Sequence, residues 1–319
     1  MPGVPPPRFV YLGPEGTFAE QALRTLPATL TASVAPARSV PEALDAVRAG
    51  DADAALVPLE NSIGGAEGVT LDELANGTPL VITREVVLAV DFVLGARPGT
   101  ALDAVTTVAA HPNAARQCRG WLREHVPGAT VVDVLSNGAA AVGVAQGEFD
   151  AAICAPIGAE RQHLSVLAKE IADHADALTR FALVSRPGSP PAPTGNDATS
   201  LAVYIAHDRV GALLAVLTEL AVRGVNLTRI ESRPTGERLG RYAFFLDCSG
   251  HVAETRMAEA LQGLRRVCSE VRFLGSYPRA TSSASFGPEE ARSAPTGTSD
   301  ADFADAAAWL AQIRAGTLP

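Results

Sequence analysis

A threonine and an arginine stand next to each other at the start of a short apolar run. Thr179 and Arg180 precede the segment 181–184, FALV, whose composition is typical of a strand. A hydroxyl can donate a hydrogen bond to a departing oxygen, and a guanidinium can bind a carboxylate through two parallel hydrogen bonds. The pair therefore has the chemistry to hold an anionic substrate. A structural ion pair of Arg180 is the competing interpretation, so further polar residues must support the first one.

Such residues occur where apolar segments end and helical patterns begin. They are Thr17, Asn61, Ser62, Asn113, Ser136 and Asn137. The start of a helix offers unpaired N–H groups and the positive end of its dipole, and both favour anions. Each side chain can equally be a plain N-cap, which is the ordinary role of Ser, Thr and Asn at this position. Several of them together favour a small polar cleft.

The elements that would position these residues alternate between strand and helix. Strand-like segments lie at 9–12, 54–59, 107–110, 131–135 and 151–154, and each leads through a loop into a helical pattern. This alternation predicts an α/β fold with a mostly parallel sheet that is covered by helices on both faces. Ligands of such sheets bind outside the carboxyl ends of the strands. The loop 13–16, GPEG, is neither a dinucleotide-binding fingerprint nor a P-loop.

The composition argues against several classes of protein. The 319 residues suffice for two domains, and their formal charge of −9 argues against a broad nucleic-acid-binding face. The first eight residues lack the apolar core of a signal peptide, and no run approaches the roughly 18 apolar residues of a membrane span. The scattered cysteines predict buried thiols in a reducing compartment; they are Cys118, Cys154, Cys248 and Cys268. We expect a cytoplasmic protein with no membrane or nucleic-acid partner.

Four motifs resemble, in order, those of prephenate dehydratases. They are YLGPEGTF at 11–18, PLENSI at 58–63, His111-Pro112 with Gln117-Cys118, and Thr179-Arg180-Phe181. The resemblance implies two α/β lobes around a cleft, similar to periplasmic binding proteins, in a catalytic domain at 1–186. Lobe one would comprise about 1–84 and 177–186, and lobe two about 85–176. The resemblance also implies catalytic roles for Thr179, Arg180, Glu60 and Asn61, and substrate contacts from Thr17, Ser62, Gln117, Ser136 and Phe181.

The chain departs from the family pattern at four places. Asp176 and Ala177 stand where the family usually has paired asparagines, and residues 162–164, QHL, replace a Tyr-Gly-Leu. Gly64 stands in place of a glutamate, and Asp91 in place of a histidine. These differences bear on the geometry of the pocket and on substrate preference, and they leave the class of reaction intact.

The second half of the chain has a different pattern. Residues 187–198 are rich in proline and predict a linker to a regulatory domain at 199–280, where the order of elements is βαββαβ, a ferredoxin-like unit. Gly211-Ala212-Leu213 and Glu231-Ser232-Arg233-Pro234 resemble the ACT domain of prephenate dehydratases, although Val210 replaces the usual proline. Residues 281–319 predict a flexible tail with a short amphipathic helix, 303–313, that docks on the body or on a partner subunit. By the resemblance, L-phenylalanine binds where two ACT domains meet, at Gly211, Ala212, Leu213, Asn226, Leu227, Glu231, Ser232, Arg233 and Pro234.

Taken together, the resemblance implies a prephenate dehydratase that phenylalanine inhibits and that forms a homodimer or homotetramer through its ACT domain. Prephenate loses water and CO2 to give phenylpyruvate, and formation of the aromatic ring drives the step, so no metal and no cofactor are expected. Arogenate dehydratase, which acts on the aminated substrate, is one alternative. The other is a non-catalytic amino-acid sensor that uses both domains only to bind.

Overall fold

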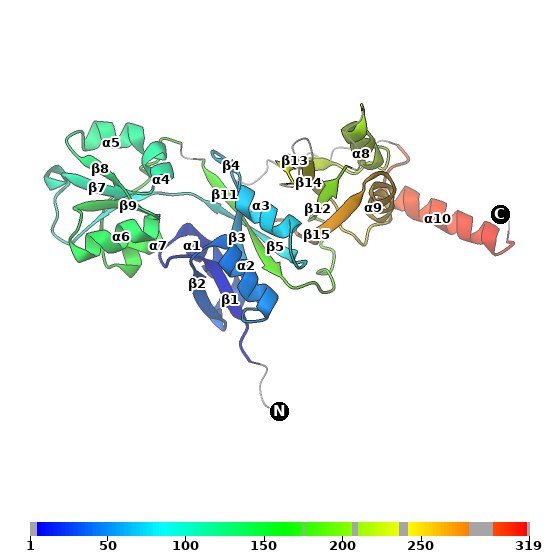
Figure 1. The fold of residues 1–319 in the computed structure, drawn as a ribbon, viewed down its shortest axis with the longest axis horizontal. Coiled ribbons are helices and arrows are strands. Elements are labelled where there is room, and N and C mark those ends of the chain that lie inside the picture. Colours follow the sequence, from blue (N-terminus) through cyan, green and yellow to red (C-terminus); the bar gives the residue numbers. More distant parts are fainter. Residues whose placement is uncertain (1–4, 175, 206–209, 236–241, 281–295, 318–319) are drawn as a thin grey trace. The chain divides into compact units, whose positions relative to one another are not determined.

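The chain divides into two units. Figure 1 shows its ribbon, coloured from the N-terminus to the C-terminus. The computed structural model describes residues 5–174, 176–205, 210–235, 242–280 and 296–317. The first unit comprises residues 1–70 and 86–186, and the second comprises residues 71–85 and 187–319. The segment 71–85, which the sequence places in the catalytic domain, therefore makes most of its contacts with the regulatory half. The first part of the flexible tail predicted at 281–319, residues 281–295, lies outside the described residues.

Lobe one is built on a mixed sheet in the order β2-β1-β3-β11-β5, with β4 added to β3. The part of α3 and β5 that lies within 71–85 belongs to the second unit. β1 runs parallel to β2 and β3, whereas β11 runs antiparallel to β3. The strands are β1 (Arg8–Leu12), β2 (Ser33–Ala37), β3 (Ala54–Asn61), β4 (Gly65–Ala66), β5 (Val81–Ala89) and β11 (Leu178–Ser185). The helices are α1 (Phe18–Arg24), the 3-10 turn Pro27–Leu30, α2 (Val40–Ala49) and α3 (Gly68–Ala75).

Helix α2 shows how the local sequence defines these elements. Ser39 caps its start by accepting a hydrogen bond from Glu42 N, and Gly50 ends it in the left-handed conformation that glycine adopts without steric cost. Val40, Leu44 and Val47 recur at helical spacing and are buried. This spacing places one apolar face against the sheet.

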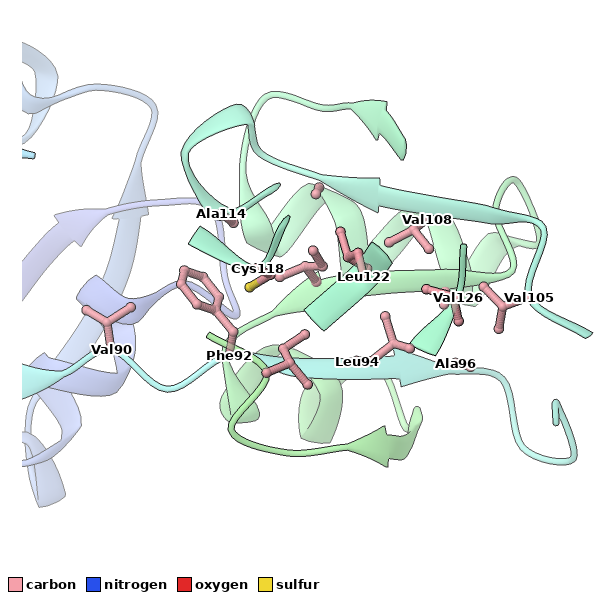
Figure 2. Packing of buried hydrophobic residues seen from close by; sticks show 14 of the residues in the cluster. Val90, Phe92, Leu94, Ala96, Val105, Val108, Ala114, Cys118, Leu122 and Val126 are labelled. Carbon is pink, nitrogen blue, oxygen red and sulfur yellow. The ribbon is translucent and has the colours of Figure 1, made fainter. Parts of the chain in front are cut away.

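Lobe two has a second mixed sheet, in the order β10-β6-β9-β7-β8. Its strands are β6 (Val93–Ala96), β7 (Thr107–Ala110), β8 (Thr130–Asp133), β9 (Ala151–Cys154) and β10 (Ser165–Ala168). Its helices are the 3-10 turn Leu102–Ala104, α4 (Pro112–Gln117), α5 (Arg119–His125), α6 (Asn137–Gln146) and α7 (Pro156–Arg161). Figure 2 shows Phe92, Leu94 and Leu122 among the side chains that fill the core of this lobe.

Two segments connect the lobes, and they lie side by side. Val90 N, just after β5, donates a hydrogen bond of 2.7 Å to Ala177 O, just before β11. The predicted two-lobed α/β architecture is confirmed. The prediction of a mostly parallel sheet is wrong in its strand directions, because the strands next to each crossing, β11 and β6, run antiparallel to β3 and β9.

The second unit contains the predicted βαββαβ order. Its elements are β12 (Asp197–Tyr204), α8 (Ala212–Ala221), β13 (Leu227–Pro234), β14 (Tyr242–Ser249), α9 (Thr255–Val267) and β15 (Glu270–Pro278). The antiparallel sheet has the order β13-β14-β12-β15. Side chains of α8, α9 and one face of the sheet form a core that includes Leu201, Val216, Leu246 and Leu264. β12 already begins at Asp197, so the connecting segment ends two residues before the predicted boundary.

The segment 71–85 packs against the same sheet. Arg272 on β15 donates hydrogen bonds to Ala75 O and Gly77 O, at 2.6 and 2.7 Å, where α3 ends. A Cβ on Gly275 would lie 2.2 Å from Ile82 O, so backbone meets backbone there and only glycine fits. Leu80 and Ile82 are 1 % and 2 % exposed.

A final helix, α10 (Asp300–Arg314), lies in the tail and includes residues 303–313. Ser299 caps it together with Asp302. Asp300 Oδ1 accepts a hydrogen bond from Arg256 N on α9, but no residue of α10 is buried, and Trp309 and Leu310 remain exposed. Docking on a partner subunit stays a prediction.

The four cysteines are free thiols and all are buried, as predicted from their spacing. Burial raises the pKa of the Cys118, Cys154 and Cys248 thiols to about 12, which makes them poor nucleophiles. Within the described residues, no helix combines the length and the apolar composition that a membrane span requires.

Candidate active site

The antiparallel pairing of β3 and β11 brings two of the sequence motifs together. In the register of this pair Thr179 lies opposite Asn61 and Arg180 lies opposite Glu60. The register shifts between Arg180 and Phe181, which marks an irregularity directly after the polar residues. The apolar parts of both strands are buried in lobe one, so the polar residues gather where β3 ends and β11 begins.

The side chain of Asn61 orients the hydroxyl of Thr179. Asn61 Nδ2 donates a hydrogen bond of 2.9 Å to Thr179 Oγ1, and Asn61 Oδ1 accepts from the backbone N–H groups of Ile63 and Gly64, both at 2.9 Å. Because two backbone donors need the amide oxygen, the amide nitrogen must face the threonine. Thr179 Oγ1 is thus an acceptor toward Asn61, and its own proton can be donated elsewhere. The residue is 8 % exposed.

Glu60 and Arg180 form an ion pair at the next position of the same two strands. Arg180 Nη1 lies 3.3 Å from Glu60 Oε2, and the two side chains are 10 % and 37 % exposed. The structure thus shows the ion pair of Arg180 that the sequence offered as one interpretation, and binding of a substrate carboxylate stays a prediction.

Ser62 holds the two strands together. Its Oγ accepts a hydrogen bond from Leu178 N, and its backbone N donates to Leu178 O, both at 2.9 Å. The hydroxyl that the sequence assigns to the substrate is therefore engaged with the backbone that positions Thr179.

The remaining predicted site residues do not join this group through hydrogen bonds that the structure shows. Thr17 Oγ1 donates to Leu12 O at 3.2 Å, and Ser136 Oγ caps α6 by accepting from Ala139 N at 3.0 Å. Phe181 is 3 % exposed in the core of lobe one, so its ring supports the strand and offers no surface to a ligand. Gln117 ends α4 in lobe two.

Three amide oxygens are buried without a hydrogen-bond partner among the described residues. They belong to Gln21, Gln117 and Asn137. Buried polar atoms are normally paired, so each is a candidate to meet a ligand or an ordered water. The sequence singled out Gln117 and placed Asn137 at a helix start, whereas Gln21 has no signal of its own, because a glutamine inside a helix is usually solvated.

One position that departs from the family pattern has a clear structural role. Ala177 is 1 % exposed in the core of lobe two and accepts the hydrogen bond from Val90 N. Asp176 is exposed. The side chain of Ala177 therefore packs in the apolar core, while its backbone links the two crossing segments.

The predicted effector residues lie on two elements of the second unit. Gly211 precedes α8 with φ of +79°, and residues 231–234 end the edge strand β13. Side chains on β13 alternate between the two faces, so Ser232 is exposed, whereas Arg233 binds Asp72 through two hydrogen bonds of 3.0 and 2.5 Å. The four-residue motif is therefore split between an open face and the face that carries the segment 71–85.

A comparison with family models decides what these two units are. Residues 9–189 match the model described as prephenate dehydratase, and residues 199–266 match the ACT domain. The chain belongs to the prephenate dehydratase family. The family's order of domains, a dehydratase domain followed by an ACT domain, is the order predicted from the motifs.

Individual relatives cover almost the whole chain. A prephenate dehydratase of Amycolatopsis methanolica is 50% identical over 97% of this chain and 98% of its own. The crystal structure of prephenate dehydratase from Arthrobacter aurescens, solved in complex with L-Phe, is 46% identical, with a TM-score of 0.88 over 96% of this chain and 99% of its own. A structure described as GqqA, a novel type of quorum quenching acylase, is 28% identical, with a TM-score of 0.76 over 86% of this chain and 98% of its own.

Proposed function

We propose that this chain converts prephenate to phenylpyruvate, with Thr179 as the hydrogen-bond donor to the departing hydroxyl. In this reaction the bond between the ring and its carboxylate breaks, and its electrons form the last ring double bond. The C–O bond breaks at the same time, and the hydroxide leaves with its electron pair and takes a proton to become water. The aromatic ring supplies the driving force, so the protein must mainly stabilise the charge that develops on the leaving oxygen.

The hydrogen bond from Asn61 to Thr179 is the observation that carries the proposal. Because Thr179 Oγ1 accepts from Asn61 Nδ2, its proton points to another acceptor, and hydrogen bonds in a chain strengthen one another. The hydroxyl is held before the substrate arrives, which is the condition for electrostatic stabilisation of a transition state. A threonine is a weak acid, so we assign it a hydrogen-bonding role, with the proton supplied finally by solvent.

Arg180 and Glu60 occupy the next positions of the same two strands. A guanidinium presents its N–H donors in a planar fork that can bind a carboxylate through two parallel hydrogen bonds. We propose that Glu60 orients the guanidinium and that a carboxylate of prephenate binds it as well. The substrate contacts assigned to Thr17, Ser62, Gln117 and Ser136 belong to the same proposal, and Gln117 is supported by its buried, unpaired amide oxygen.

GqqA is described as an acylase, and acyl transfer by a side-chain hydroxyl requires a neighbouring base to activate it. In this chain the partner of Thr179 Oγ1 is the amide of Asn61, which donates a hydrogen bond and cannot remove a proton. The geometry therefore favours a hydrogen-bond donor over a nucleophile at Thr179.

The reaction is tested by incubating the purified full-length protein with prephenate and, separately, with arogenate, and by measuring phenylpyruvate and phenylalanine against heat-inactivated protein. We expect phenylpyruvate from prephenate, with a kcat/KM at least about tenfold higher than for arogenate, since a site built for one polar group discriminates against its replacement. Turnover of arogenate alone would identify an arogenate dehydratase. Turnover of neither substrate would overturn the proposal.

The second unit supports regulation by phenylalanine. The Arthrobacter aurescens relative was crystallised with L-Phe. We propose that L-phenylalanine binds this chain where two ACT domains meet, with Gly211, Ala212 and Leu213 on one side and Asn226, Leu227 and Glu231–Pro234 on the other. The resulting homodimer or dimer of dimers, and a cytoplasmic location, belong to this proposal. An effector inhibits only if it binds an inactive arrangement more tightly than the active one.

The effector site is tested with Ser232→Leu, because Ser232 lies on the open face of β13 and the change leaves Arg233 and its partner in place. We expect normal turnover of prephenate and loss of phenylalanine inhibition. The mass of the protein with and without phenylalanine, measured by light scattering, checks the assembly. Full inhibition of a strictly monomeric protein would contradict the shared site.

A further inference from the structure

A buried carboxylate of lobe one is paired with an arginine of lobe two. Glu20 on α1 is completely buried, and its carboxylate accepts hydrogen bonds from Gly16 N at 2.8 Å and from Arg24 Nε at 2.7 Å. Its third partner is Arg161 Nη2, at the end of α7. The second nitrogen of the same guanidinium, Arg161 Nη1, lies 3.0 Å from Glu15 Oε2. One side chain of lobe two thus bridges two carboxylates of lobe one.

The charge of Glu20 depends on these partners. Burial by itself raises the pKa of this carboxyl, but the hydrogen bonds from Gly16, Arg24 and Arg161 outweigh it and lower the pKa below its ordinary value. A buried carboxylate that loses a partner is strongly unfavourable, so the chain near Glu20 must rearrange or admit water if Arg161 moves away. The ion pair therefore links the position of α7 to the position of α1.

The backbones of the two lobes also touch around this pair. A Cβ on Gly158 of α7 would lie 2.8 Å from Gly16 O, and a Cβ on Gly138 of α6 would lie 2.5 Å from Glu15 O. Phe18 at the start of α1 meets Phe92 of lobe two edge to face, with ring centroids 5.2 Å apart. The loop 13–17 is thus fitted closely between lobe one and the starts of α6 and α7.

This contact bears on the proposed site because both lobes contribute to it. Thr179 and Asn61 belong to lobe one, whereas Ser136, the N-cap of α6, and Gln117 belong to lobe two. Ser136 is two residues from Gly138, which touches the loop. The distance between the lobes at this loop therefore sets where the lobe-two candidates stand relative to Thr179.

We propose that Arg161 is a positioning residue that clasps lobe two to lobe one through Glu20 and Glu15, and so keeps the catalytic unit in the arrangement that binds substrate. The proposal rests on the proposed function for its kinetic consequence. Without the clasp, only a fraction of the molecules has the lobes in place at any time. The apparent dissociation constant of the substrate then rises by the inverse of that fraction, while molecules that have closed on it react at the usual rate.

The test is the Arg161→Gln variant of the full chain, compared with Arg97→Gln. Arg97 is the matched control, because it donates hydrogen bonds to Val144 O and Phe149 O, at 2.8 and 2.9 Å, within lobe two alone. For Arg161→Gln we expect a KM for prephenate raised about tenfold with kcat within about twofold of wild type. For Arg97→Gln we expect a lower unfolding temperature and an unchanged KM.

A second measurement needs no substrate and so separates this proposal from the proposed reaction. Hydrogen exchange of the peptide that spans residues 13–23 should be faster in Arg161→Gln than in wild type or Arg97→Gln, because Gly16 N–H loses its ordered acceptor when the pair breaks. Unchanged exchange together with wild-type KM would overturn the clasp, whatever the substrate of the protein is.

The milder variant Glu15→Gln covers the case in which Arg161→Gln does not fold. The side chain of Glu15 is 57% exposed, so its loss leaves the buried pair intact. We expect a smaller rise in KM in the same direction. Combined with Arg161→Gln it should add nothing further, since both changes remove one shared contact. Additive effects of the two substitutions would contradict a single clasp.

Discussion

The side-chain amide of Asn61 has two hydrogen-bonding roles that the local sequence does not reveal. Its oxygen closes the turn after β3 through the N–H groups of Ile63 and Gly64, and its nitrogen orients Thr179 from the opposite strand. Each function uses a different end of the side chain, so they can be separated by substitution.

Asn61→Asp tests this division. An aspartate keeps an acceptor for the turn but offers no N–H to Thr179, whose hydroxyl would then donate to the carboxylate and be lost to the substrate. We expect kcat for prephenate to fall by about 10- to 100-fold, which is less than loss of a direct transition-state donor costs. The unfolding temperature should stay close to that of wild type. Asn61→Ala, which loses both functions, should also be less stable. A fully active Asn61→Asp variant would show that the amide does not orient the hydroxyl.

The sequence names both partners of this contact but not the contact itself. Thr179 and Asn61 are 118 positions apart, and no spacing rule connects them. The antiparallel register of β3 and β11 does so, and register depends on which faces are buried in the folded sheet. Phe181, which the resemblance assigns to the substrate, lies in the core of lobe one, and its burial likewise depends on the folded sheet.

At the scale of elements, Asp150 ties the beginnings of two lobe-two strands together. Its Oδ2 accepts hydrogen bonds from the backbone N and the hydroxyl of Thr106 and of Thr107, at distances from 2.7 to 3.0 Å. The hydrogen bond from the Thr106 hydroxyl is the largest of the effects that lower the pKa of this carboxyl to about 2. Because the pKa of Asp150 is lower in the folded state than in the unfolded chain, ionisation of this carboxyl favours folding.

Asp150→Asn should therefore destabilise the protein in a pH-dependent way. The stabilisation by the carboxylate is fully present above the unfolded pKa of about 3.9 and is lost as the pH falls toward the folded value. We expect wild type to unfold at a higher urea concentration than the variant, by the same margin at pH 7 and pH 5, with the margin shrinking at pH 3. A margin independent of pH from 7 to 3 would show that the charge is not what matters.

The elements themselves were predicted where the period of apolar residues is clear. The strands β1, β3, β7, β8 and β9 and the six elements of the ACT domain follow from the pattern. β2 does not, because its sequence SVAPA contains a proline and only Ala37 is buried. The direction of the strands next to the lobe crossings could not be predicted either. The alternation of apolar and polar residues indicates which face of a strand is buried, but it does not indicate whether the neighbouring strand runs parallel or antiparallel.

At the scale of the whole molecule, the segment 71–85 connects the regulatory sheet to the proposed site by covalent continuity. The segment begins inside α3, which follows the turn after Asn61, and ends inside β5, the strand next to β11. Arg233 and Arg272 of the ACT domain hold this segment by hydrogen bonds. Its apolar residues look like any core in the sequence, so the domain that buries them could not be predicted.

Asp72→Asn tests whether this segment transmits the effector signal. The change weakens the pair with Arg233 and touches no proposed substrate contact. We expect unchanged turnover of prephenate, unchanged binding of phenylalanine by calorimetry, and weaker maximal inhibition at saturating phenylalanine, because the change lowers the coupling between the sites and not the affinity. Asp45→Asn, which weakens the exposed pair with Arg48, is the control and should behave like wild type. Wild-type maximal inhibition of Asp72→Asn would mean that the signal takes another route.

The central claim, that the Thr179 hydroxyl stabilises the leaving hydroxide, is tested most directly by single-turnover kinetics of Thr179→Ser and Thr179→Ala with prephenate. Both variants keep the backbone that Ser62 holds, and only the first keeps a hydroxyl within reach of Asn61. We predict that Thr179→Ala loses about 10²- to 10³-fold in the rate of phenylpyruvate formation, whereas Thr179→Ser retains most of it. An alanine variant that forms phenylpyruvate at the wild-type rate would contradict the account.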